Sequence, residues 1–301
     1  FIKWFNDEIE YYAVQSSRHM KIYSTDKKNV KAVLSKLFSD SGLYAAQNFQ
    51  GDKVCTGLNG HYHRKEYCYK NIAKSIYNWL PEILLLPNEL ADNSPENLEN
   101  KIAIYTKNKN KHIDSLNELI AKVLLHSTIR TEYKSQPIPA SLYIDDAMGT
   151  CFDNIHIIIE SHSPDCLLMG YSHLIGGETD AAIDLIIKEF DELLGSESFD
   201  TQRDKILEIK EDTYLLKHDI DEILCSNTSL DEHINRFRFV FFIGYESDSL
   251  ECHNLNMPAN YVVQLQEEVT KKFSTLIDRL IEESDYYKDL HVDVYIYPVP
   301  S

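Results

Sequence analysis

An α/β fold with a mixed β-sheet flanked by helices is the architecture that the sequence predicts. Residues 152–160 and 166–172 form two apolar arms around a turn-forming segment that contains Pro164, which predicts a β-hairpin. Residues 236–245 are apolar and aromatic almost throughout, a composition typical of a buried strand. Amphipathic helical patterns separate these strands, and such alternation indicates a sheet covered by helices on both faces.

The first hundred residues predict a mixed α+β region without a dominant pattern. Apolar residues at helical spacing predict one helix over residues 30–38 and another over residues 65–86. A strand is expected at residues 20–24. The polar, turn-rich stretch at residues 87–97 is the best internal boundary. We therefore expect an N-terminal region of residues 1–100 and a second domain of residues 101–301.

The remaining two thirds of the chain give a clearer order of elements. Pro137 and Pro139 force extended chain at residues 136–140, and Gly176-Gly177 allow a tight turn after the hairpin. The other predicted elements are a helix at 112–129, a helix at 178–194, one or two helices within 200–225, a helix that opens at Pro258, and a last strand at 290–298 that Pro298 stops.

The charge distribution limits the kinds of partner that this chain can bind alone. The net charge is −18, whereas a protein that coats nucleic acid needs an excess of Lys and Arg to neutralise phosphates. Residues 1–70 nevertheless hold 11 Lys and Arg against 7 Asp and Glu, so the acidic excess lies wholly outside them. The acidic surface has two interpretations: ordinary solubility, or a basic partner that supplies the grip on nucleic acid.

Cysteine usage and hydropathy indicate a soluble protein of the cytoplasm. The six cysteines form no CxxC pair, so we expect reduced thiols. No apolar run approaches the roughly 20 residues of a membrane helix, and the first residues lack the pattern of a secretory signal. Walker, GxGxxG and GxSxG motifs are also absent, so any ATP chemistry would have to come from a partner.

Five short motifs follow one another within residues 110–301. They are Phe-Asp-Asn-Ile-His at 152–156, Leu-Met-Gly-Tyr-Ser-His at 168–173, Asp-Ala-Ala-Ile-Asp-Leu-Ile-Ile at 180–187, Phe-Ile-Gly-Tyr-Glu-Ser at 242–247 and Val-Asp-Val-Tyr-Ile-Tyr-Pro at 292–298. Each motif alone is weak, but their order and spacing resemble the HamA family, the nuclease-like subunit of the bacterial anti-phage system Hachiman.

The resemblance implies a restriction-endonuclease-like core of the PD-(D/E)XK type that works on DNA with a HamB-like helicase. In such a core two carboxylates hold Mg²⁺, with Mn²⁺ or another divalent ion as an alternative, and a nearby Lys activates water. Here Asp153 matches the first acid, but Tyr171 and His173 stand at the acid and Lys positions. Phenol and imidazole suit Mg²⁺ poorly, so the substitutions affect catalysis rather than the fold.

Three interpretations of this substituted motif stay open. In the first, the nuclease is inactive and the domain serves as an adaptor or regulator that docks on the helicase. In the second, the protein cleaves with Asp153 as metal ligand, His173 in the water-activating position and Tyr171 beside it, helped by ligands that have migrated to Glu132, Glu160 or His156. In the third, the alignment is wrong, and Tyr171 and His173 merely face the interior or the solvent. As a separate alternative for the function, the chain is a soluble α/β protein unrelated to defence.

Two further patterns are weaker candidates for a site. The triplets Glu132-Tyr-Lys134 and Glu208-Ile-Lys210 resemble the acid-x-Lys motif, but both fit solvated helix charges better. Four residues with zinc-ligating side chains, Cys55, His61, His63 and Cys68, fall within fourteen positions, yet no tight CxxC-like knuckle is present. Their neighbours over residues 62–70 form a basic-aromatic patch of the kind that stacks on bases or contacts other proteins.

Overall fold

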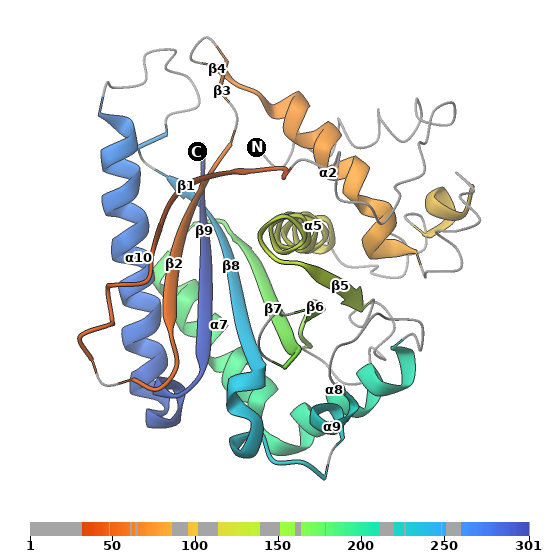
Figure 1. The fold of residues 1–301 in the computed structure, drawn as a ribbon. Helices are drawn as coiled ribbons and strands as arrows, with labels where there is room; N and C mark the ends of the chain where they lie inside the picture. Colours follow the sequence, from red (N-terminus) through yellow and green to blue (C-terminus); the bar gives the residue numbers. More distant parts are fainter. Residues whose placement is uncertain are drawn as a thin grey trace.

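A seven-stranded mixed sheet runs through the computed structural model of this protein (Figure 1). The strand order is β1-β2-β9-β8-β7-β6-β5. The four central strands β2, β9, β8 and β7 are mutually parallel, and β1, β6 and β5 extend the sheet at its edges through antiparallel pairing. The structure describes residues 32–47, 49–60, 62–63, 66–85, 96–101, 114–138, 151–159, 164–177, 179–210, 220–225, 227–247, 249–250 and 260–300.

The sheet strands are β1 (Ser35–Asp40), β2 (Lys53–Asn59), β5 (Ser135–Ile138), β6 (Asn154–Ile158), β7 (Cys166–Ile175), β8 (Phe237–Ser247) and β9 (His291–Pro300). A small separate hairpin pairs β3 (Tyr62–His63) with β4 (Glu66–Tyr67). The helices are α2 (Tyr69–Leu84), α5 (Asp114–Glu132), α7 (Thr179–Leu194), α8 (Ser196–Ile209), α9 (Asp221–Leu224) and α10 (Tyr261–Glu283), with the short 3-10 segments η4 (Asp231–Arg236) and η5 (Asp285–Lys288).

Helices cover both faces of the sheet, as Figure 1 shows. On one face α7 and α10 pack over the central strands, and their buried residues share one apolar cluster with alternate residues of β7, β8 and β9. On the other face α2 and α5 pack in a second cluster with the intervening residues of the same strands. Alternation explains this division, because successive strand side chains point to opposite faces. The central strands are apolar on both sides because both sides are buried.

The hairpin, the helices predicted after residue 64 and the two long C-terminal strands confirm the sequence prediction, although α10 begins at Tyr261 and not at Pro258. Strands β6 and β7 are antiparallel neighbours, and β8 and β9 form the parallel centre of the sheet. The expected α/β class with a mixed sheet flanked by helices is therefore correct. Pro298 does not stop the last strand, which continues to Pro300. Gly177 adopts a positive φ of 86° directly after β7, as the predicted turn requires.

The predicted helix over residues 30–38 is wrong. Residues 35–40 form the edge strand β1, and β2 follows it as an antiparallel partner that the sequence did not predict. Both strands belong to the main sheet, because β2 also pairs in parallel with β9. The division at residue 100 stays a prediction. The expected strand at residues 20–24 and most of the turn-rich stretch at 87–97 lie outside the described residues.

The residues before Pro137 and Pro139 form extended chain, as the sequence predicts, and β5 is the edge strand beyond β6. Among the helices that the structure describes, none combines the length and apolar composition needed to cross a bilayer.

Candidate functional site

The hairpin of β6 and β7 places Asp153 beside the carboxyl half of β7. Asn154 pairs with Gly170, and the backbone N–H of Asp153 donates to the Gly170 carbonyl at 2.9 Å. Phe152 and Ile155 anchor the start of β6 in the core on either side of Asp153. Because β7 continues to Ile175 while β6 begins only at Asn154, the last residues of β7 extend past the end of its antiparallel partner.

The Asp153 carboxylate is held by three internal hydrogen bonds. Oδ2 accepts from the backbone N–H of Ser172 at 3.0 Å and from its hydroxyl at 2.5 Å. Oδ1 accepts from the Asn154 amide at 3.0 Å. Burial raises the pKa of the Asp153 carboxyl, against the opposing effects of Lys122 and of these hydrogen bonds. The group therefore ties β6 to β7 and has little capacity left for an external ligand.

Tyr171 is buried and bound to α7. Its hydroxyl donates to Oε2 of Glu189, a residue in the second half of that helix. Burial raises the pKa of Tyr171 far above its usual value, and the hydrogen bond with the Glu189 carboxylate raises it further. Tyr171 is therefore a neutral hydrogen-bond donor at any physiological pH.

His173 lies on the same face of β7 as Tyr171, two residues further along. The two rings meet edge to face with centroids 4.5 Å apart. The His173 side chain is 32% exposed, yet its Nε2 atom is shielded from solvent and has no hydrogen-bond partner among the described residues. Oε2 of Glu189 lies 3.8 Å from this Nε2 atom. Burial lowers the pKa of His173, although Asp153 and Glu118 favour its protonated form.

Asp153, Tyr171 and His173 are thus brought together as the sequence predicts. Asp153 bonds directly to Ser172, which lies between the other two, and its charge acts on the pKa of both. Two residues of α5, Glu118 and Lys122, also act electrostatically on His173.

The other residues suggested as ligands lie elsewhere. Glu132 at the end of α5 pairs with Lys36 at 2.5 Å, and ten residues along the helix separate it from Lys122, which corresponds to about 15 Å. His156 points to the opposite face of the sheet, where the centroid of its ring lies 5.0 Å from the centroid of the His126 ring. The His156 side chain is buried there. Glu160 lies outside the described residues.

The weaker sequence candidates gain no support from the described residues. In the second acid-x-Lys triplet, Glu208 pairs with Lys205 on the surface of α8, whereas the Lys210 side chain is only 7% exposed and pairs with Asp221 of α9. Cys55 is buried in the core, where burial raises the pKa of its thiol to about 12 and so opposes the thiolate that zinc needs. His61 and the His63 side chain lie outside the described part, so the four-residue zinc prediction stays a prediction.

Sequence reasoning missed Glu189 and Ser172. Glu189 is one acid among several on α7, next to Phe190, whose ring packs against Phe239 and Phe241 at 5.5 and 4.9 Å. This packing fixes the turn of α7 that presents Glu189 to Tyr171. As a single residue, Glu189 looks like any solvent-exposed helix acid. The signal that could have found it is its position directly before Phe190, a large buried residue of the apolar stripe of α7.

The residues present do not fit a divalent metal in this arrangement. Among the described residues, no three His, Cys, Asp or Glu side chains are grouped so as to hold a metal ion. Three of the roughly four lone-pair positions of the Asp153 carboxylate already accept hydrogen bonds from Asn154 and Ser172. The Glu189 carboxylate already accepts one from the Tyr171 hydroxyl. A hard cation such as Mg²⁺ would need oxygen ligands that these contacts already engage.

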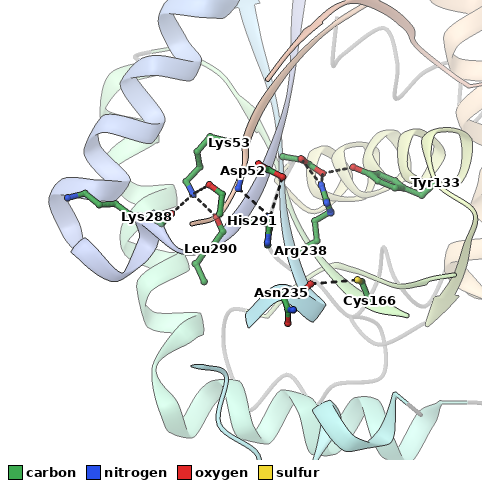
Figure 2. A network of polar contacts seen from close by, with 11 residues as sticks. Asp52, Lys53, Tyr133, Cys166, Asn235, Arg238, Lys288, Leu290 and His291 are labelled. Carbon is green, nitrogen blue, oxygen red and sulfur yellow. Dashed lines mark hydrogen bonds and ion pairs between the residues drawn. The ribbon is translucent and has the colours of Figure 1, made fainter. Parts of the chain in front are cut away.

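A second polar network lies at the amino ends of the central strands (Figure 2). Asp293 accepts from Arg238 at 2.9 and 3.2 Å and from the Tyr133 hydroxyl. Lys53 is buried and donates to the backbone carbonyls of Gly51, Lys288 and Leu290. Arg238 is five residues along β8 from the partner of His173, about 16 Å away.

The contacts within this network join elements that are distant in sequence. Tyr133 follows α5, Arg238 is the second residue of β8 and Asp293 lies in β9. Lys53 connects the start of β2 to the turn before β9. Burial opposes the charge of Arg238, but Asp293 more than offsets this and raises the pKa of Arg238 above its usual value. Since these charged groups bind one another or backbone carbonyls, we infer that the network stabilises the fold and is not a binding site.

Comparison with known proteins gives the family. The sequence model of the HamA family matches residues 6–301. This chain belongs to the HamA family.

One curated relative supports membership in HamA along the whole chain. Over 311 aligned residues the chain is 34% identical to anti-bacteriophage protein A of Escherichia coli (strain K12), and the alignment covers all of this chain. The chain spans 54% of the length of that relative. The resemblance found in the hairpin and C-terminal strands is therefore confirmed at the level of the HamA family, including the first hundred residues, where the sequence motifs contributed little.

Proposed function

We propose that this HamA-family protein acts in defence against bacteriophages, as a nuclease-fold subunit that works on DNA with a helicase partner and does not itself cut DNA through a bound metal. Family membership and the name of its Escherichia coli relative support the defence role. The helicase partner and the DNA substrate are proposed from the resemblance to the Hachiman system. The protein would then be an adaptor that docks on the helicase and regulates its access to DNA.

One observation carries the non-cleaving part of the proposal. The carboxylate of Asp153 is engaged by Ser172 and Asn154, and the position of the second acid holds Tyr171, which is bonded to Glu189. Metal-assisted hydrolysis needs open coordination positions for water and phosphate. The internal contacts leave the described residues without such a set of ligands.

A cleavage assay tests this claim. The protein is purified together with a HamB-like helicase from the same organism and incubated with plasmid DNA, ATP and Mg²⁺ or Mn²⁺. We expect no nicking above that of the helicase alone, from the wild type or from Asp153→Asn. Metal-dependent nicking that the wild type shows and Asp153→Asn loses would refute the proposal.

Phage plating and co-purification test the defence and adaptor roles separately. Cells that carry both genes should resist phage infection, and cells that lack either gene should not. The helicase should co-purify with this protein, and its DNA-stimulated ATPase rate should change on binding. Protection by the helicase gene alone, or no association between the two proteins, would contradict the adaptor role.

A cleaving nuclease is the second candidate function. The convergence of Asp153, Tyr171 and His173 on one stretch of β7, with Lys122 and Glu118 near enough to act on His173, favours it. The same plasmid assay decides between the two functions, because only a cleaving enzyme depends on Asp153 for strand breaks.

A further inference from the structure

We propose that Asp153, Tyr171, His173 and Glu189 form a metal-free joint between the hairpin and α7, in which Tyr171 donates to Glu189 in place of a divalent cation and the His173 ring lies beside the same carboxylate without a hydrogen bond to it. We call these four residues the hairpin joint. The inference deepens the proposed function, because it names the contacts that replace metal binding.

The first argument is the way in which Glu189 is positioned. It precedes Phe190, whose buried ring contacts Phe152, Phe239 and Phe241 and so fixes that turn of α7 against the sheet. The Glu189 side chain is 25% exposed, so its carboxylate lies at the margin of the core. From there it accepts from the Tyr171 hydroxyl and lies 3.8 Å from His173 Nε2.

The second argument is the balance of donors and acceptors. Each carboxylate in the hairpin joint already has protein donors: Ser172 and Asn154 for Asp153, and Tyr171 for Glu189. A divalent ion would have to displace these donors, and buried acceptors and donors left without partners are costly. Tyr171 also contributes no negative charge, because burial and Glu189 keep it protonated.

The third argument is the electrostatic balance around His173. Asp153 from the start of β6, Glu118 from α5 and Glu189 from α7 supply negative charge, while Lys122 from α5 supplies positive charge. Lys122 also stabilises the charged form of Asp153. The positive charge that a metal would supply to neighbouring carboxylates is thus partly supplied by the chain itself.

Thermal unfolding with and without metal tests the hairpin joint. For the wild type we expect the same Tm in EDTA, Mg²⁺ and Mn²⁺, and no loss of the free Mn²⁺ signal in electron paramagnetic resonance. Tyr171→Phe and Glu189→Gln should each lower Tm by roughly 2 °C or more under all three conditions, because each removes one partner of the shared contact.

A gain-of-binding variant supplies the readout that a purely structural role would not change. Tyr171→Glu adds a third carboxylate to the hairpin joint, next to Ser172, which binds Asp153, and at the position whose side chain contacts Glu189, so Mn²⁺ should raise its Tm and the resonance signal of free Mn²⁺ should fall. The matched control is Tyr171→Gln, because the Gln side chain has the size of Glu but no charge. This variant should show neither effect.

Two results would overturn the inference. One is Mn²⁺ binding by the wild type that is lost in Asp153→Asn or Glu189→Gln. The other is an unchanged Tm in both Tyr171→Phe and Glu189→Gln. Neither result bears on phage plating, so a failure of the hairpin joint is distinguishable from a failure of the defence role.

Discussion

A methyl group has no room at position 170, beside the candidate site. A Cβ atom there would lie 2.8 Å from Cδ2 of Leu125 and 2.9 Å from the carbonyl oxygen of Asn154. Glycine therefore lets α5 and β6 both approach β7 closely. We expect Gly170→Ala to lower the free energy of unfolding by about 1–3 kcal/mol through overpacking, measured by urea denaturation.

A matched substitution checks that prediction. Gly176 has no atom within 4 Å of a built Cβ, so Gly176→Ala should leave stability nearly unchanged. Equal losses in the two variants would show that close packing at Gly170 is not the cause.

His156 makes the stability of the fold dependent on pH. Burial lowers the pKa of His156 well below its ordinary value of 6.5, and the charges of His126 and Arg130 lower it further. The unfolded chain thus binds a proton at a higher pH than the folded protein. Stability is complete above pH 6.5 and falls as pH drops toward the folded pKa, by up to about 1.4 kcal/mol per pH unit.

Denaturation at pH 7.5, 6.5 and 5.5 measures this effect of His156. We expect the wild type to lose stability over this range more steeply than His156→Gln, which has nothing to titrate there. Parallel profiles for the two proteins would mean that other groups, such as His173, cause the loss.

At the scale of elements, the Arg238–Asp293 pair should contribute strongly to stability. Asp293 is 3% exposed, so removal of Arg238 leaves a buried carboxylate without its cation. We expect Arg238→Met to cost about 3 kcal/mol and Tyr133→Phe to cost about 1 kcal/mol, measured by chemical denaturation.

The exposed pair of Lys36 and Glu132 is the control for the Arg238 experiment. Their side chains are 41% and 33% exposed, so Lys36→Ala should cost less than about 1 kcal/mol. A similar cost for Lys36→Ala and Arg238→Met would contradict the role assigned to burial.

The elements that the sequence predicted correctly are those whose pattern is local. The run at 236–245 is apolar almost throughout, the stripe of α7 keeps one helical period over many residues, and both formed as expected. Strand β2 was missed because Lys53 and Gly57 interrupt its apolar pattern. Lys53 is tolerated there only because carbonyls from Lys288 and Leu290, far along the chain, accept from it.

The candidate site shows the same limit of prediction. Asp153, Tyr171 and His173 could be placed together because the resemblance to a PD-(D/E)XK hairpin assigns them to matching positions on two adjacent arms, and the two arms do pair. Glu189 could not, because its contact with Tyr171 depends on how α7 rotates and packs after it leaves β7. The helix expected at 30–38 failed because pairing with β2 overrides the helical spacing of Val33, Leu34 and Leu37.

For the whole molecule, one sheet joins the two regions that the sequence predicts as separate. β1 and β2 come from the first sixty residues, and β2 pairs with β9. We expect the fragment 101–301 to fold poorly alone, because β9 would lose its parallel partner and leave its backbone N–H and C=O groups unpaired at a new edge of the sheet.

Near-ultraviolet circular dichroism and dye binding measure the state of that fragment. It should show little tertiary signal and strong binding of a hydrophobic dye, in contrast to the full chain. A cooperative unfolding transition in fragment 101–301, at a Tm near that of the full chain, would establish it as an independent domain.

The parallel contact between β2 and β9 also sets the order in which the protein can be completed in the cell. Lys53 of β2 pairs with Val292 of β9, so the ribosome must add about 240 residues after the start of β2 before its parallel neighbour exists. Until then the nascent β1–β2 hairpin has an open edge, and such non-local pairing folds slowly. Prematurely terminated chains would therefore lack β9, one of the four central strands, and be targets for chaperones or proteases.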